Sequence, residues 1–199
     1  MAGTAKQVRS GRAPIVDSAI RNFNERGYHG TSMRDIAAGA GVTVASIYHH
    51  FAAKQDVLVR IMAGTMTDLL EVTTAAAAAA GGEAASARAR LEAVVDAWVR
   101  FHTERQAEAR IGASEMRSLE GEGRELVIGL RDQEELLFRG IIEDGVERGE
   151  FATRFPREAA RAVLNMGSTI STWYHLGGVL TPEDMAERYR DFALGTVRG

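Results

Sequence analysis

The sequence contains no cysteine in 199 residues and only three prolines. Without cysteine, disulfide bonds and metal sites with thiolate ligands are excluded. No apolar run approaches the ~20 residues that a membrane-spanning helix requires, and the N-terminus shows no signal-peptide pattern. We therefore expect a cytoplasmic protein with no membrane partner.

The scarcity of proline and of strand-like alternation, with abundant Ala, Leu, Arg and Glu, predicts an all-α fold of about nine helices. At 45% hydrophobic residues, the chain can bury a substantial core. Residues 1–10 are expected to form a mobile arm. Apolar periodicity, glycines and capping residues place the longer helices at residues 11–26, 53–74 (with an alanine-rich extension to residue 80), 84–105, 107–119, 122–148, 156–176 and 181–196.

Charge is distributed unevenly along a chain whose net charge is −3. Residues 1–60 hold eight Lys and Arg against four Asp and Glu, a net of +4, which leaves −7 for the rest. A basic N-terminal quarter on an acidic body is typical of a DNA-reading head on a body that repels phosphate. Counts this small also arise by chance, so charge alone does not decide the function.

The most informative stretch begins at Ser32 and predicts two short helices joined by a tight turn. Ser32, with Asp35 three residues later, forms a capping box for the first helix. Gly39 and Gly41 bracket the turn, where glycine takes a left-handed conformation at least cost. The apolar residues between cap and turn give this helix one buried side.

The second helix of this stretch follows Thr43, a capping residue. Ile47 and Phe51 are four positions apart and therefore turn inward together. The outward face then carries small residues at its start and Tyr48 and His49 towards its end. Such a face suits a helix lying in the DNA major groove. The alternative is a helical hairpin with incidental polar residues.

The whole run resembles the DNA-binding domain of the TetR-like transcriptional regulators. The matching pieces are G-T-S-M-R-D-I-A (30–37), A-G-V-T (40–43) and S-I-Y-H-H-F (46–51), followed by Lys54. The resemblance implies a helix-turn-helix head over residues 1–56, with the arm, and a helical ligand-binding and dimerisation body over residues 57–199. It also implies that the second motif helix enters the major groove of a double-stranded DNA operator.

The resemblance further implies which side chains meet the DNA. Arg34 matches a phosphate-contact position, whereas Val44 and Ala45 offer base edges only apolar contact, so shape readout is expected to contribute. Two alternatives stay open, because Tyr48 could brace the helix and His50 could contact the body. The expected DNA-contacting residues are Arg34, Thr43, Val44, Ala45, Ser46, Tyr48, His49, His50 and Lys54.

Small residues recur at three- and four-residue spacing in the helix expected at residues 156–176. Such a face lets a second helix approach closely, either within one chain or between two copies. The family resemblance favours a homodimer, because the last two helices of these regulators form a four-helix interface, and a two-fold dimer suits a palindrome. The expected interface residues are Leu164, Gly167, Ser168, Ser171 and Thr172.

Aromatic and Met side chains on several body helices could line an apolar cavity, which in this family holds an inducer. The alternative is an ordinary core. The segment 173–182 resembles regulators of fatty-acid and sterol breakdown that respond to coenzyme A thioesters, so a small apolar inducer such as an acyl-coenzyme A is expected. The expected ligand-binding residues are Trp98, His102, Arg105, Met116, Phe138, Met166 and Trp173.

Three classes of function remain: a ligand-responsive repressor, a small helical enzyme and a DNA-binding scaffold without a ligand. An enzyme would need convergent catalytic groups, yet the five His are scattered, and adjacent His49 and His50 point about 100° apart on a helix. A bound small molecule would distinguish the repressor from the scaffold. We expect a repressor that binds a palindromic operator as a homodimer and is released by ligand, with no cofactor and no catalytic or metal site.

Overall fold

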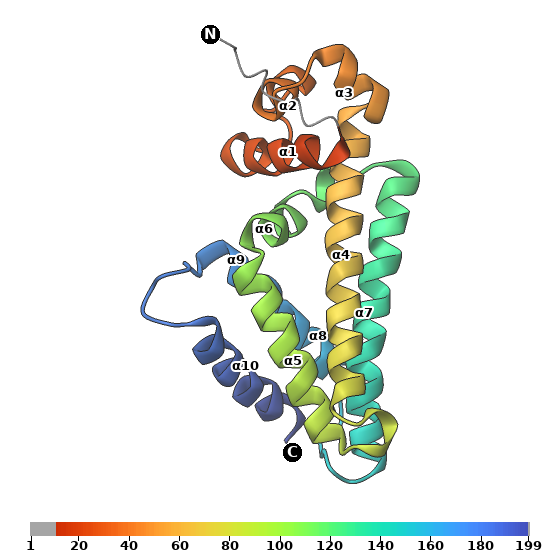
Figure 1. The fold of residues 1–199 in the computed structure, drawn as a ribbon. Coiled ribbons are helices and arrows are strands. Elements are labelled where there is room, and N and C mark those ends of the chain that lie inside the picture. Colours follow the sequence, from red (N-terminus) through yellow and green to blue (C-terminus); the bar gives the residue numbers. More distant parts are fainter. Residues whose placement is uncertain (1–10, 199) are drawn as a thin grey trace.

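The structure, a computed structural model, describes residues 11–198, and over that range it consists of helices and turns without a strand. The arm expected at residues 1–10 lies outside the described residues. Figure 1 shows a small group of helices at one end of a longer helical body. The α-helices are α1 (Arg12–Arg26), α2 (Met33–Ala40), α3 (Val44–His50), α4 (Lys54–Ala79), α5 (Ala87–Glu104), α6 (Gln106–Ser114), α7 (Gly121–Glu147), α8 (Pro156–Ser168), α9 (Ile170–Trp173) and α10 (Pro182–Val197).

Helices α1 to α3 form the head, where the predicted caps and the left-handed Gly41 are confirmed, whereas Gly39 lies within α2 and not in the turn. The Ser32 hydroxyl accepts the Asp35 backbone N–H at 3.2 Å, and the Asp35 carboxylate accepts the Ser32 N–H at 2.8 Å, which completes the capping box. Gly41 ends α2 at φ 69°, a left-handed conformation that favours glycine. Thr43 caps α3 by accepting the Ser46 N–H at 3.1 Å.

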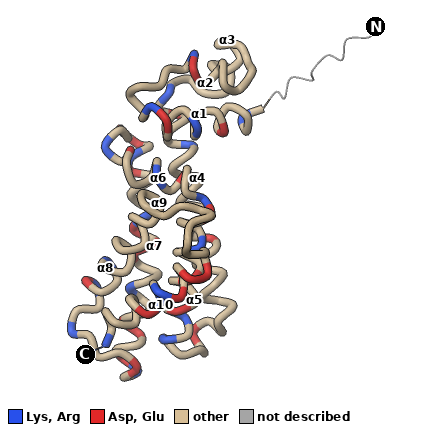
Figure 2. Tube along the Cα trace, turned by 90° about the vertical axis from the view of Figure 1, so that its left-hand side faces the viewer, with Lys and Arg blue, Asp and Glu red and all other residues tan. Residues whose placement is uncertain are grey.

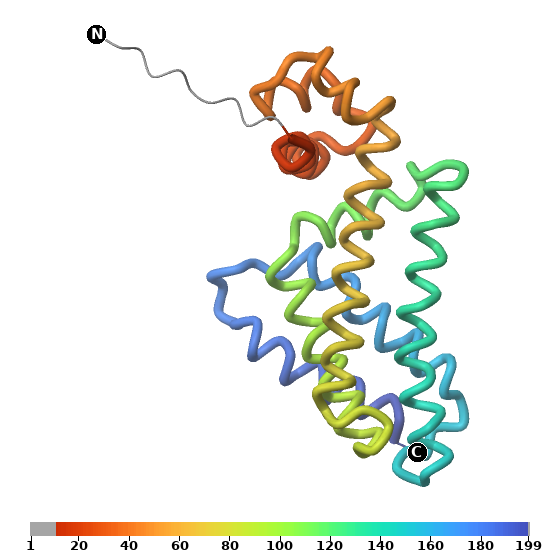
Figure 3. Tube along the Cα trace, turned by 45° about the vertical axis from the view of Figure 1, so that its right-hand side comes forward, coloured from red at the N-terminus to blue at the C-terminus, as the bar shows by residue number. Residues whose placement is uncertain are grey.

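Helix α4 connects the head to the body. Its 26 residues rise about 1.5 Å each, so it spans about 39 Å. Figures 1 and 3 show it running from the head to the far end of the body, with α7 beside it. The boundary predicted between residues 56 and 57 therefore falls within the first turn of a continuous helix.

The buried side chains form two clusters. The body cluster is built from α4, α5, α7, α8, α9 and α10, with the fully buried Phe138 among its largest members. The head cluster joins α1 to α3 and the start of α4 to Ile111, Leu119 and Val127 of the body. Met66 of α4 packs against both clusters. The head is therefore not packed on itself alone.

The single helix predicted at residues 156–176 is interrupted. Helix α8 ends at Ser168, α9 begins at Ile170, and Tyr174 is already extended. Three hydroxyl groups donate to backbone carbonyls three residues earlier: Ser168 to Asn165, Thr169 to Met166 and Thr172 to Thr169. Such bonds compete with the helical hydrogen-bond ladder, and they explain why the pattern of apolar residues overestimated the helix.

Between α9 and α10 the chain forms a loop that projects from the body (Figure 1). Thr181 and Asp184 form the capping box predicted for the last helix, with Pro182 at its first position. None of the helices between residues 11 and 198 is long and apolar enough to cross a membrane.

Candidate nucleic-acid interface and ligand cavity

Helix α3 presents an exposed face without Lys, Arg, Asp or Glu at the end of the head. Ile47 is fully buried, whereas Tyr48 is 52% exposed and Val44 is 37% exposed. Of the residues expected to contact DNA, Arg34, Thr43, Ala45 and His49 are also exposed, and Ser46 and His50 are half-buried. Figure 2 shows that α3 itself carries no Lys or Arg. Most of the expected DNA-contacting residues are thus accessible on the head, and Arg34 of α2 is the exposed cation among them.

Lys54 occupies a different environment from the exposed residues of α3. Its ammonium donates to the backbone carbonyls of Tyr28 and Thr31, both at 2.6 Å, and lies 4.2 Å from the centre of the Tyr28 ring. Burial lowers the pKa of Lys54, although the negative charge of Glu115 raises it. Lys54 therefore fixes the connection between α1 and α2, a role that the sequence did not suggest.

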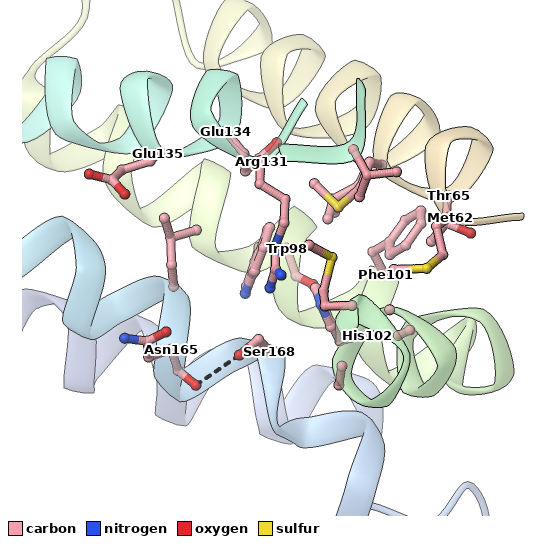
Figure 4. A pocket seen from close by; sticks show the side chains of 18 of the residues that line it. Met62, Thr65, Trp98, Phe101, His102, Arg131, Glu134, Glu135, Asn165 and Ser168 are labelled. Atoms are coloured by element: carbon pink, nitrogen blue, oxygen red, sulfur yellow. Dashed lines mark hydrogen bonds between the residues drawn. The ribbon is translucent and has the colours of Figure 1, made fainter. Parts of the chain in front are cut away.

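A cavity of about 380 Å³ lies in the body, and we call it the central cavity. Figure 4 shows its polar side chains projecting from α5, α7 and α8. Helices α4 and α6 complete its wall through mainly apolar residues. The lining residues include Met62, Thr65, Met66 and Leu69 of α4, Trp98, Phe101 and His102 of α5, Ala109, Gly112 and Ala113 of α6, Met116 just beyond α6, Arg131 and Glu134 of α7, and Leu164, Asn165 and Ser168 of α8.

The structure brings only some of the residues expected to bind ligand to the central cavity. Trp98, His102 and Met116 line the central cavity. Phe138 does not line it but is fully buried behind Trp98, with ring centres 5.7 Å apart. Met166 packs against the body core, and Trp173 is 48% exposed because it follows the interruption after α8.

Arg105 also lies away from the central cavity. Helix α5 ends at Glu104, so Arg105 leaves the face that Trp98 and His102 share. Its guanidinium pairs with Asp68 at 2.5 Å and with Glu108 at 3.1 Å, at the edge of a second, smaller cleft beside α1. The prediction that Arg105 lines the cavity was therefore wrong.

Sequence reasoning named no lining residue on α4 and missed the charged groups of α7. The α4 residues follow the three- and four-residue spacing of one helix face, so their periodicity could have indicated a cavity wall. Glu134 gave no such signal, because an acidic residue within a helix is usually exposed. Here it is only 1% exposed.

Two titratable groups of the cavity are strongly perturbed. The pKa of His102 is lowered to about 4, chiefly by burial and to a smaller extent by the charge of Arg131, against the hydrogen bond to the Trp98 carbonyl, which raises it. Burial raises the pKa of Glu134 to about 7, although the hydrogen bond from Thr73 acts in the opposite direction. At neutral pH His102 is therefore uncharged, and Glu134 is close to its titration midpoint.

The small-residue face of α8 turns largely inward. Gly167 is buried, and a Cβ there would overlap the indole of Trp98. Ser171 is fully buried, and its carbonyl accepts hydrogen bonds from Arg110 of α6. Leu164 and Ser168 line the central cavity. Placing Gly167 and Ser171 in a dimer interface was wrong for this reason, and among the predicted set Thr172 alone is well exposed.

Helix α6 links the cavity wall to the head. The Asn24 side chain of α1 donates to the Ala107 carbonyl at 3.0 Å, and Glu115, just past α6, accepts the Tyr28 backbone N–H at 3.3 Å. Figure 1 shows α6 directly beneath α1. Two cavity walls, α4 and α6, thus touch the head.

Comparison with known proteins finds matches over most of the chain. Residues 84–197 match the tetracyclin repressor-like C-terminal domain, and residues 15–61 match the bacterial regulatory proteins of the tetR family. The HTH-type transcriptional repressor KstR2 of Rhodococcus jostii RHA1 is 30% identical over 92% of this chain and 89% of its own length.

Solved structures agree with these sequence matches. A bacterial regulatory protein in the tetR family from Rhodococcus RHA1 superposes with a TM-score of 0.88 at 31% identity, covering 98% of both chains. AibR, solved in complex with isovaleryl coenzyme A and operator DNA, superposes with a TM-score of 0.80 at 27% identity, covering 91% of this chain and 96% of AibR.

Proposed function

The chain belongs to the tetR family of bacterial regulatory proteins and is a helix-turn-helix transcriptional regulator; from that premise we propose that it is a repressor released from its operator by a ligand in the central cavity. One observation carries this proposal: α4 and α6 wall the cavity and also contact the head that bears α3. A ligand that displaces either helix therefore acts on DNA binding.

The head reads DNA with few charged groups. Val44 and Ala45 can meet thymine methyl groups, and DNA shape supplies further specificity. Arg34 contacts phosphate from α2, and Lys54, which has three N–H donors and uses two within the head, keeps one for phosphate. Because phosphate contacts release counterions, operator affinity falls steeply as salt rises.

The size of the central cavity limits the part of a ligand that it can enclose. At the ~30 Å³ that one water molecule occupies in the liquid, 380 Å³ holds about a dozen non-hydrogen atoms. A medium-length acyl chain fits this space, whereas the nucleotide of coenzyme A does not. We therefore place the acyl group of an acyl-coenzyme A inside the cavity and its nucleotide outside, on the side of the exposed Arg131.

The protein acts as a homodimer through the outer faces of α8 and α10. Phe192 of α10 is 54% exposed, an apolar side chain on a helix that otherwise shows charge to solvent. A two-fold dimer places two α3 helices about 34–36 Å apart, one turn of DNA, so that each enters a major groove of an inverted repeat.

The test is a thermodynamic cycle on an operator selected from random duplex DNA. Decanoyl-coenzyme A is titrated into the protein with and without this operator. Because coupling between two binding sites is reciprocal, the ligand must bind more weakly to the DNA complex. Equal ligand affinity in both titrations refutes ligand release, and failure to select an inverted repeat refutes operator binding.

A cavity-filling variant with a matched control locates the ligand. Met116→Trp fills the cavity from the segment after α6 and should abolish the response to decanoyl-coenzyme A while operator binding remains. Leu126→Trp introduces the same side chain at a position of α7 that is 52% exposed and does not line the cavity. It should respond like wild type.

A further inference from the structure

The tautomer of His102 is fixed by its surroundings. Nδ1 lies 2.8 Å from the Trp98 carbonyl, which can only accept, so Nδ1 carries the proton. In the neutral imidazole the other nitrogen, Nε2, is then a bare hydrogen-bond acceptor. It has no partner among the described residues. Figure 4 shows the His102 ring among the residues lining the central cavity, close to Trp98 and Arg131.

Glu134 brings a second incomplete polar group to the same cavity. One carboxyl oxygen, Oε2, accepts a hydrogen bond from Thr73 of α4 at 3.2 Å. The other, Oε1, is buried without a partner in the described structure. Glu134 comes from α7 and His102 from α5, so polar atoms without a hydrogen-bond partner in the described structure line the cavity from two helices.

A purely hydrocarbon chain has the right size for this cavity but leaves its polar groups unpaired. It would remove water from Nε2 of His102 without supplying a hydrogen bond, and buried polar groups left unpaired weaken binding. A site with buried hydrogen-bonding groups discriminates strongly against analogues that lack the matching group. The cavity is apolar enough to hold an acyl chain, yet it demands one donor on that chain.

We propose that the ligand carries a hydroxyl group on the part enclosed by the central cavity, and that this hydroxyl donates to Nε2 of His102 beside Glu134. The ligand class is therefore a hydroxylated acyl thioester rather than a plain fatty acyl thioester. This proposal rests on the function proposed above, because it takes the central cavity as the inducer site. It goes further by naming the chemical group that the site selects.

Three coenzyme A thioesters test the proposal by calorimetry: decanoyl, 3-hydroxydecanoyl and 10-hydroxydecanoyl. The two hydroxylated compounds place the hydroxyl at opposite ends of the chain. At least one of them should bind wild type 10-fold or more tightly than decanoyl-coenzyme A and release operator DNA at correspondingly lower concentration. If neither binds more tightly, the hydroxyl requirement is refuted.

His102→Phe separates hydrogen bonding from shape, because Phe keeps the ring and removes the acceptor. It should reduce the preference for the hydroxylated compound to about onefold and tighten binding of decanoyl-coenzyme A. Glu134→Leu is the second variant, and it should tighten binding of decanoyl-coenzyme A in the same direction. Leu126→Trp, at an exposed position of α7 that does not line the cavity, is the control and should keep the wild-type preference. A preference unchanged in His102→Phe overturns the role assigned to His102.

The failure of this proposal is distinguishable from failure of the proposed function. Equal binding of all three thioesters, with release of operator DNA, refutes the hydroxyl requirement and leaves the repressor mechanism intact. Absence of binding by all three, or binding without any effect on the operator, counts against both.

Discussion

Two buried groups of the central cavity should make protein stability respond to pH in opposite directions. Glu134 has its pKa raised from the ordinary 4.5 to about 7, so its contribution to stability is fully present below pH 4.5 and is lost as pH rises through about 7. His102 has its pKa lowered from 6.5 to about 4, so its contribution is fully present above pH 6.5 and is lost as pH falls towards 4.

The two effects should nearly cancel in wild type. At about 1.4 kcal/mol for each pKa unit, lowering the pH from about 7.5 to about 5 adds about 2 kcal/mol to the free energy of unfolding through Glu134. The same change removes about 2 kcal/mol through His102. Single substitutions separate the contribution of Glu134 from that of His102. Glu134→Gln should become less stable relative to wild type as the pH falls, and His102→Phe should become more stable relative to wild type.

Urea unfolding followed by far-ultraviolet circular dichroism, at fixed protein concentration, measures these differences. Glu125→Gln removes an exposed carboxylate of the same helix and controls for the change in net charge. If the difference between wild type and Glu134→Gln does not change between the two pH values, the raised pKa of Glu134 is refuted. A flat difference for His102→Phe refutes the neutral, buried imidazole in the same way.

Three further predictions concern single contacts. Lys54→Met leaves the carbonyls of Tyr28 and Thr31 without their charged donor. It should lower the free energy of unfolding by about 1.5–3 kcal/mol and weaken operator binding. Unchanged stability in urea would contradict the contacts described. Ser32→Ala removes the cap of α2 and should cost about 0.5–2 kcal/mol in the same assay, whereas wild-type stability would mean that the cap is dispensable. Phe192→Arg should give a monomer in sedimentation while Phe155→Arg, at another exposed Phe, stays dimeric; a dimeric Phe192→Arg would exclude α10 from the interface.

Local rules predicted the head well. Ser32, Asp35, Gly41 and Thr43 act through hydrogen bonds and backbone angles within a few residues of themselves, so their spacing in the sequence contains most of the information. The family resemblance added the order of the helices in the body. It did not add which face of each body helix turns inward.

The cavity was harder to predict because it depends on where helices end. Arg105 follows His102 by three residues and would share its face in a longer helix, but α5 stops one residue before it. Trp173 lies outside the cavity because the predicted helix is interrupted after Ser168. Gly167 was read as a contact between subunits, although its missing side chain accommodates Trp98 of the same chain. The first two errors concern the point at which a helix ends, and the third concerns packing between distant segments; residue spacing along one helix determines neither.

The head cluster limits how DNA-binding heads can be exchanged between such regulators. Ile111, Leu119 and Val127 of the body complete the apolar interior of the head. A chimera that joins a foreign head to this body within α4 would therefore create mismatched volumes at these three positions, even with the helix itself unbroken. Operator specificity should transfer between relatives when the head and these three body residues come from the same parent. The segment that must be exchanged is therefore larger than the helix-turn-helix and is discontinuous in sequence.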